Sequence, residues 1–514
     1  MDRFLAWICG AATGWPGWRP AVVFIGAHAL LWTAVLTLMK AGQDIHYDTA
    51  EAFAWGQQFL LGYGKHPPLS GWIAGLWFRI FPTTDAAAYG LAMATLAVGL
   101  AATWAIARRV VDSRRAFVAT VALAMYPIFN FKGYKYNADL LQLATLPLIV
   151  LAYLHAFERR SVRAGIWLGL AGAAGLMTKY WAVTTIGAVG LAALIHPQRM
   201  AFLRSPAPWV ALTVLALAML PHVVWLAQVH FLPFTYAGDV YKLPAWSANP
   251  RPVLDYLGHH LGLLAPVIVV TVLMLGLQRP SLHGRLRWAA FPASSHVVQP
   301  GPALNVWLVQ AIIALGPPLA AWALAIYLKS VWGIPLFFLM PLALIALPLL
   351  GVKRIAMAWM LCLWLLVSLG ALAASPWLAV KFGHGGRVLH GTGPRSEMAL
   401  TITEAWHKRF ARPLSVVVGI TDVSAPLAFY SPDHPVPFVP GEPWSELLTS
   451  LDAAKRIGFV GICDRDDWRF ETCTAWMAQH ASGAEQMVLS RQRYLMNGDV
   501  EHLQWHVYIV APAN

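Results

Sequence analysis

The stretch PAVVFIGAHALLWTAVLTLM, residues 20–39, decides the fold class because it contains no Asp, Glu, Lys or Arg. A run of about 20 apolar residues is long enough to cross the hydrocarbon core of a bilayer as a helix. Similar runs recur at 86–107, 116–131, 139–157, 164–178, 181–196, 207–229, 259–277, 306–327, 333–350 and 355–375. The sequence therefore predicts a polytopic α-helical membrane protein with about 11 spans.

The composition supports this prediction. Of the 514 residues 58% are hydrophobic and 12% are charged, whereas a soluble globular protein carries about 25% charged residues. This balance excludes an ordinary cytosolic enzyme, a disordered protein and a nucleic-acid-binding factor. The net charge of +13 comes from Lys and Arg that mostly lie between the apolar runs, which indicates membrane topology and contact with membrane lipids.

The distribution of these cations predicts the orientation. If the N-terminus lies inside, the inside loops are 108–115, 158–163, 197–206, 278–305 and 351–354. These loops hold more Lys and Arg than the loops on the outside. Cytoplasmic loops carry the excess of positive charge in membrane proteins. An odd number of spans then places the C-terminus outside.

The last part of the chain, residues 376–514, has no apolar run of span length and differs from the membrane domain, 1–375. Apolar β-rich runs at 414–420, 456–463 and 503–512 predict buried strands, with helices near 396–410, 445–455 and 467–481. This predicts a soluble C-terminal α/β domain. Cys463 and Cys473 lie close in its sequence and can pair if the domain faces an oxidising compartment.

The first outside loop, 40–85, is too long for a simple connector and contains DIHYDTAEAFAWGQQFL at 44–60. Its apolar residues Phe53, Trp55, Phe59 and Leu60 have helical spacing, which predicts an amphipathic helix at the membrane surface. On one continuous helix Asp44, Asp48 and Glu51 would share a face. A purely structural alternative is a capping box, with Asp48 as N-cap and Glu51 at the third helical position.

Cations follow at the same predicted membrane face. KHPPL at 65–69 supplies Lys65 and His66, and FNFKGYKYNADL at 129–140 supplies Lys135 and Asp139. The segment GLMTKYW adds Lys179. Interfacial anchoring, capping by Asn137 and a lysine that reaches back to the surface are the structural alternatives.

Carboxylates and cations gathered at one face suit one kind of chemistry. A carboxylate takes a proton from an acceptor hydroxyl, while Lys and Arg stabilise a departing phosphate. The pattern favours group transfer from a lipid-linked phosphate donor. A transporter or flippase is the alternative, but it should show inverted repeats, and none is visible in the sequence.

The motifs resemble those of a known family. The residues that carry the resemblance, within roughly 20–200, are Asp48, Trp55, Gln57, Tyr63, His66, Pro67, Pro68, Asn137, Asp139, Thr178 and Lys179. In this pattern the chain resembles the bacterial branch of the protein-mannosyltransferase-like family. That branch belongs to the C-type membrane glycosyltransferases, which include the lipid A aminoarabinose transferases.

The resemblance implies an inverting transfer of a sugar from a polyprenyl-phosphate donor to a hydroxyl at the periplasmic face of the bacterial inner membrane. The implied acceptor is lipid A, another glycolipid or a polysaccharide of the cell envelope, and a protein acceptor is an alternative. Some relatives use a divalent cation, but the sequence shows no dense spacing of metal ligands, so no cofactor is predicted.

The resemblance also assigns roles. Asp48 matches the catalytic acidic residue, but many relatives have Asp-Glu where this chain has Asp48 and Thr49, so Asp44 and Glu51 remain alternatives. The other assignments are donor-phosphate binding by Lys65, His66, Lys135 and Lys179, and substrate positioning by Asp139, Tyr63 and Trp55.

Overall fold

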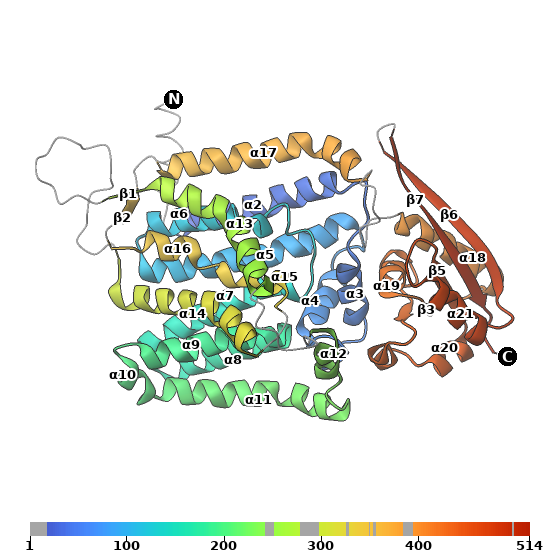
Figure 1. Cartoon of the computed structure of the whole chain (residues 1–514), viewed down its shortest axis with the longest axis horizontal. Helices are drawn as coiled ribbons and strands as arrows, with labels where there is room; N and C mark the ends of the chain where they lie inside the picture. The colour runs from blue at the N-terminus through green and yellow to red at the C-terminus, as the bar shows by residue number, and fades with distance from the viewer. Residues whose placement is uncertain are drawn as a thin grey trace, which may run out of the picture.

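The computed structural model describes residues 18–241, 251–277, 298–324, 328–348, 350–352, 356–383, 394–495 and 498–513. It consists of a helical membrane bundle and an α/β domain that lies at one end of the bundle, beside α3 (Figure 1). The N-terminal helices are α2 (Arg19–Met39), α3 (Tyr47–Gly56), α4 (Leu69–Phe78), α5 (Asp85–Val110), α6 (Ser113–Ala124), η1 (Pro127–Phe129), α7 (Ala138–Arg159), α8 (Val162–Thr178), η2 (Tyr180–Ala182) and α9 (Val183–Ile195). They are followed by α10 (Arg199–Leu203), α11 (Pro206–Gln228), α12 (Leu232–Tyr241), α13 (Arg251–Met274), α14 (Pro300–Leu324), α15 (Ser330–Gly333), η3 (Ile334–Phe337), α16 (Met340–Ile345) and α17 (Ala356–Gly383).

Seven helices among the described residues are long and apolar enough to cross a membrane, namely α2, α5, α7, α11, α13, α14 and α17. Three more apolar helices are shorter: Leu69–Phe78, Val162–Thr178 and Tyr180–Ile195. The protein is thus a multi-pass helical membrane protein, while the count of about 11 crossings and the inside position of the N-terminus stay predictions. Of the loop 278–305, residues 278–297 lie outside the described residues.

Two of the expected spans are not continuous helices. The segment 116–131 ends as α6 at Ala124, and η1 begins at Pro127. The segment 333–350 is divided between η3, α16 and the short strand β2 (Leu350–Val352), which pairs with β1 (Leu275–Leu277). Pro335 and Pro341 each stand in the first turn of a new helix, because proline lacks the N–H that a continuing helix needs.

Small residues let the membrane helices pack closely. A Cβ on Gly99 of α5 would lie 2.1 Å from the backbone oxygen of Leu143 on α7. A Cβ on Gly169 of α8 would similarly lie 2.6 Å from the backbone oxygen of Ala211 on α11. Such close backbone approach is typical of membrane helices, where packing rather than water exclusion drives association.

The C-terminal domain contains α18 (Arg395–Phe410), β3 (Val416–Val418), α19 (Thr421–Tyr430), β4 (Val436–Phe438), η4 (Pro443–Leu447), α20 (Leu451–Ile457), β5 (Phe459–Asp464), α21 (Phe470–His480), β6 (Glu485–Leu495) and β7 (Gly498–Val510). Its five strands lie in the order β4-β3-β5-β7-β6. The pairs that β3 makes with β4 and β5 are parallel, and β7 pairs antiparallel with β5 and β6. Strands β3, β5 and β7 lie where the sequence predicted strands, whereas β4, β6 and α19 were not predicted.

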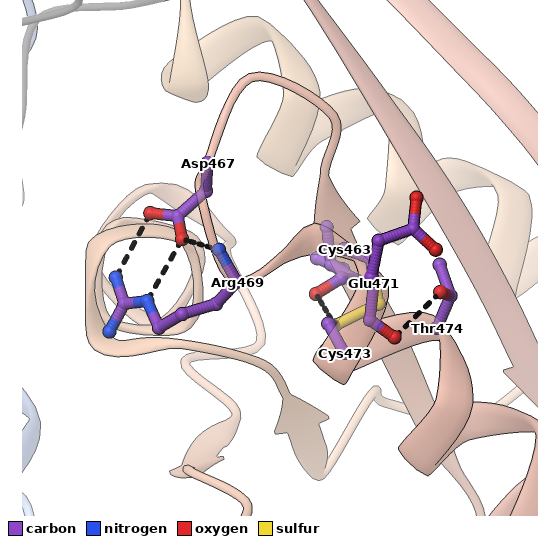
Figure 2. The surroundings of a disulfide bond; sticks show 7 residues. Cys463, Asp467, Arg469, Glu471, Cys473 and Thr474 are labelled. Atoms are coloured by element: carbon purple, nitrogen blue, oxygen red, sulfur yellow. Dashed lines mark hydrogen bonds and ion pairs between the residues drawn. A yellow bond between two sulfur atoms is a disulfide. The ribbon is translucent and has the colours of Figure 1, made fainter.

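A disulfide joins Cys463 at the end of β5 to Cys473 in α21, with the two Cα atoms 5.7 Å apart (Figure 2). Figure 2 also shows Arg469 folded back onto Asp467 in the connecting loop, with Arg469 Nε 2.9 Å from Asp467 Oδ1. The pairing that the sequence allowed is therefore present in the structure.

The C-terminal domain is docked directly on the first outside loop. The Phe53 ring of α3 lies 5.2 Å from the Phe429 ring of α19, and the backbone N–H of Ile45 donates to Tyr430 Oη over 2.9 Å. Helix α3 is therefore buried between the bundle and the domain, and its position at the membrane surface stays a prediction. It also ends at Gly56, so Phe59 and Leu60 are not part of it.

Candidate active site

The start of α3 determines which carboxylates reach the site. The N-cap is His46, whose Nδ1 accepts the backbone N–H of Asp48 over 3.1 Å, so the capping box is not formed. Asp44 precedes the helix and accepts hydrogen bonds from the backbone N–H and the hydroxyl of Ser396. The expectation that three carboxylates share one helix face is thus wrong for Asp44, which holds the C-terminal domain instead.

Asp48 lies at the centre of a polar cluster. Its Oδ2 is 3.0 Å from Lys135 Nζ and accepts a hydrogen bond from Asn137 Nδ2 over 2.9 Å. Burial favours the neutral carboxyl, but His46, Lys135 and the Asn137 amide outweigh it and hold the pKa of Asp48 well below its usual range. With 22% of its side chain exposed, Asp48 is an ionised carboxylate that a substrate can reach.

Glu51 lies one turn further along α3 and forms a second cluster. Lys65 Nζ donates to Glu51 Oε1 over 2.9 Å and lies 3.8 Å from Glu442 Oε2 of the C-terminal domain. Burial acts to lower the pKa of Lys65, but the two carboxylates raise it above its usual value. Burial also raises the pKa of both Glu51 and Glu442, and the Lys65 ammonium that they share opposes this rise without cancelling it.

A third pair joins the first turn of α7 to the end of α8. Lys179 Nζ donates to Asp139 Oδ1 over 2.5 Å and lies 5.3 Å from the centre of the Trp332 ring. Asn137 caps α7 by accepting the backbone N–H of Leu140, which places Asp139 in the first turn as the sequence suggested. Lys179 is 9% exposed, so its ammonium is held in an ion pair and does not reach back to the membrane surface.

His66 lies among these clusters. Burial and then the positive charge of Lys179 lower the pKa of His66 to about 3, so the imidazole is neutral at neutral pH. It can donate one hydrogen bond to a phosphate but brings no charge. Its backbone exchanges two hydrogen bonds with Tyr63, at 2.9 and 3.2 Å, which forms the turn before Pro67.

Tyr63 and Trp55 support the loop. Tyr63 Oη donates to the backbone oxygen of Trp55 over 2.7 Å, and the two rings stack 5.0 Å apart. Both residues are buried. Their contacts fix the turn that carries Lys65 and His66 against α3.

An open cavity of about 270 Å³ is lined in part by Lys135 and Asn137, the two residues that contact Asp48 Oδ2. One part of its lining is polar, with Lys132, Lys135, Asn137 and Asp139. The other part is apolar, with Ile128, Leu140, Leu143, Val331, Ile334 and Pro335. Cationic groups beside an apolar wall are the surroundings that a lipid phosphate requires.

Glu442 and Trp444 were not predicted as site residues from the sequence. They lie in the segment PGEPW at 440–444, far along the chain from α3. The local signal was an acidic residue and a tryptophan in a turn with two prolines, which indicates only a rigid loop. No local pattern links this turn to Lys65.

Within the part of the chain that the structure describes, no three His, Cys, Asp or Glu side chains converge as a metal site. Each carboxylate near Asp48 contacts an ammonium group or an amide instead. The side chains present offer ion pairs and hydrogen bonds to a phosphate and to hydroxyl groups.

Parts of this chain match known proteins in sequence. Residues 65–225 match the family described as dolichyl-phosphate-mannose-protein mannosyltransferase. The chain is 24% identical to the lipid A galacturonosyltransferase RgtD of Rhizobium johnstonii over 326 residues, which cover 60% of this chain and 65% of RgtD.

Solved structures share the fold. ArnT from Cupriavidus metallidurans bound to undecaprenyl phosphate has a TM-score of 0.58 at 13% identity, over 96% of this chain and 99% of that one. The apo state of the same protein gives a TM-score of 0.59 at 13% identity, over 98% and 100%. The resemblance predicted from the sequence is confirmed: the chain is similar in sequence to dolichyl-phosphate-mannose-protein mannosyltransferases over residues 65–225 and to RgtD, and it is similar in fold to ArnT.

Proposed function

We propose that this protein transfers a sugar from a polyprenyl-phosphate donor to a hydroxyl of a lipid A-type glycolipid at the periplasmic face of the membrane. The observation that carries the proposal is the cavity lined by Lys132, Lys135 and a wall of apolar side chains, in which Lys135 is also the ion-pair partner of Asp48. The lysines suit the phosphate of the donor, and the wall suits the first units of a prenyl chain.

In the proposed step the acceptor oxygen attacks the anomeric carbon from the side opposite the phosphate. A new C–O bond forms, the bond to the phosphate oxygen breaks, and the polyprenyl phosphate leaves with the electron pair. The proton of the acceptor hydroxyl passes to Asp48. Lys135 and Lys132 stabilise the charge that develops on the leaving phosphate.

The contact between Asp48 and Lys135 links donor binding to this proton transfer. A donor phosphate that takes Lys135 as its partner removes a cation from Asp48, and the pKa of Asp48 then rises. The carboxylate thereby becomes a stronger base when the donor is bound. Glu51 is the alternative base, since burial already raises its pKa.

The relatives support lipid A as the acceptor and a polyprenyl phosphate as the carrier. The name of RgtD specifies lipid A, and one ArnT structure holds undecaprenyl phosphate. The disulfide between Cys463 and Cys473 supports the periplasmic position of the C-terminal domain, because disulfides persist in oxidising compartments.

The test is mass spectrometry of envelope glycolipids and glycoproteins from cells with the wild-type gene, without the gene, and with Asp48→Asn. We expect the deletion and the substitution to remove the same sugar-sized mass from a lipid A-type glycolipid. If a protein loses the sugar-sized mass instead, the acceptor is a protein and not a glycolipid. A normal glycolipid profile in the Asp48→Asn cells would show that Asp48 is not required, and Glu51→Gln would be tested next.

A further inference from the structure

A loop of the C-terminal domain lies directly on the turn of the first outside loop. A Cβ on Gly64 would lie 1.6 Å from Cβ of Trp444, so only glycine allows the two segments to meet in this way. Gln58 Nε2 also donates to the backbone oxygen of Leu448 over 3.1 Å. The loop that contains η4 is therefore fixed against the turn that carries Lys65.

Two side chains of this loop reach Lys65. Glu442 Oε2 lies 3.8 Å from Lys65 Nζ, and the centre of the Trp444 ring lies 5.4 Å from the same nitrogen. The side chains of Lys65 and Glu442 are 15% and 28% exposed. On the opposite side the ammonium is bound by Glu51. Lys65 is thus held between a carboxylate of the membrane domain and one of the C-terminal domain.

We propose that Glu442 is a positioning residue for the transfer reaction, which acts through Lys65 on Glu51, and that the C-terminal domain thereby completes the active site. The inference rests on the proposed function, which names Glu51 as the alternative base, and Lys65 is the ion-pair partner of Glu51. Glu442 shares the Lys65 ammonium with Glu51 and thereby lowers the positive charge that Glu51 experiences.

The charges around Glu51 and Glu442 determine how the loss of the Glu442 charge shifts the pKa values of Lys65 and Glu51. Glu51 faces Lys65, Asp48 and Glu442, while Glu442 faces Lys65, the Arg469 guanidinium and the Trp444 indole. Removing the Glu442 charge takes an anion away from both Lys65 and Glu51. The pKa of Lys65 falls because its charged form loses a partner, and the pKa of Glu51 falls because it loses a repelling neighbour.

The first experiment compares transfer by the full-length wild type, Glu442→Gln and Glu446→Gln across pH. Glu446 is exposed on η4, the short helix that Glu442 directly precedes, and serves as the matched control. We expect Glu442→Gln to lower kcat by about tenfold, less than the hundredfold that a 1 Å misplacement can cost. The acidic limb of the pH–rate profile of Glu442→Gln should move to lower pH, because the pKa of Glu51 falls. A loss of folded protein alone would not move this limb. A wild-type rate and profile in Glu442→Gln would overturn the proposal.

The second experiment does not depend on transfer activity. The purified full-length proteins are treated with an amine-reactive acylating reagent, and modification of Lys65 is followed by peptide mass spectrometry at several pH values. A pKa lower by half a unit makes Lys65 react about threefold faster at a fixed pH below its pKa. We expect this in Glu442→Gln, an intermediate rate in Glu442→Asp, and the wild-type rate in Glu446→Gln.

Equal labelling of Lys65 in the wild type and in both Glu442 variants would overturn the positioning role. A wild type that labels as expected but transfers no lipid-linked sugar would overturn the proposed function alone. The labelling comparison would then still decide whether Glu442 controls Lys65. If Glu442→Gln does not fold, the comparison of Glu442→Asp with the wild type decides the same question.

Discussion

Asn137 binds Asp48 through one end of its amide and caps a helix through the other. Its Nδ2 donates to Asp48 Oδ2 over 2.9 Å, and its Oδ1 accepts the backbone N–H of Leu140 over 2.9 Å. The two residues are 89 positions apart in the chain. One side chain therefore fixes the carboxylate of α3 relative to the start of α7, and a change there affects the site and the helix in separable ways.

The substitution Asn137→Asp separates these two roles. Aspartate caps a helix as well as asparagine does, so the helix should keep its stability. The new carboxylate cannot donate to Asp48 and repels it, so we expect transfer to fall by about a hundredfold. Transfer rates and melting temperatures in detergent measure the two effects.

A matched control for this prediction is Ser161→Ala, which removes the N-cap of α8 but touches none of the carboxylates. It should lower stability by about 1 kcal/mol and leave the rate unchanged. If Asn137→Asp transfers sugar at the wild-type rate, the amide serves only as a cap.

Lys179 and Asp139 should show unequal effects on stability. The Lys179 side chain is 11% exposed and that of Asp139 is 25% exposed. Asp139→Ala leaves the more buried ammonium without its carboxylate, at a cost of about 1–3 kcal/mol, whereas Lys179→Ala should cost less. Lys179→Ala should also raise the KM for the donor if the ammonium binds its phosphate.

A double-mutant cycle checks this prediction. The variant that carries both Lys179→Ala and Asp139→Ala should be more stable than Asp139→Ala alone, because the unpaired ammonium is gone. Additive losses together with an unchanged donor KM would show that the pair contributes neither to stability nor to donor binding.

The neutral state of His66 predicts how stability depends on pH. Burial lowers the pKa of His66 from 6.5 to about 3, so in this range the unfolded chain binds the proton more readily than the folded one. The stabilising contribution is complete above the unfolded pKa and is lost as the pH falls from 6.5 toward 3. Between pH 6.5 and 5 the loss should be about 1.5 kcal/mol.

His66→Gln removes this contribution. The melting temperature of the wild type should therefore fall more than that of His66→Gln when the pH is lowered from 6.5 to 5. Both proteins contain Glu51 and Glu442, so the difference between their melting temperatures at each pH does not include the contribution of these two carboxyl groups. Parallel curves for the two proteins would mean that His66 does not change its charge on unfolding in this range.

Local patterns predicted the long apolar helices and the capping role of Asn137, because the period of the apolar residues and the cap residues both act within one element. They also identified Asp48, Lys135, Asp139 and Lys179 as candidates. They could not identify the docking of the C-terminal domain. That docking depends on the fit of Gly64 to Trp444, and a contact between distant segments leaves no periodic signal in either of them.

The start of α3 shows the same limit on a smaller scale. The sequence offered Asp48 as an N-cap, but His46 occupies that position. The helix consequently begins too late to include Asp44, whose carboxylate binds Ser396 instead. Tertiary contacts decide which of the two nearby residues caps the helix, and a local pattern does not contain them. For that reason Asp44 was included among the catalytic candidates.

The disulfide tests the position of the C-terminal domain. Cys463 and Cys473 close a loop with a sequence separation of 10 residues, which should stabilise the domain by about 3 kcal/mol. Replacing both with serine should lower the melting temperature, and adding a reductant should do the same to the wild type. Cys362→Ser is the control, because Cys362 is a free cysteine of α17.

The redox state of the same pair in cells decides which side of the membrane the domain faces. Cells are treated with an alkylating reagent before lysis, and the peptides are mapped without reduction. We expect Cys463 and Cys473 to be linked and unmodified, because an oxidising compartment preserves the bond. If both are recovered as alkylated thiols, the domain faces the reducing cytoplasm. The transfer would then have to take place on that side, since Glu442 and Trp444 of the domain contact Lys65 in the candidate site.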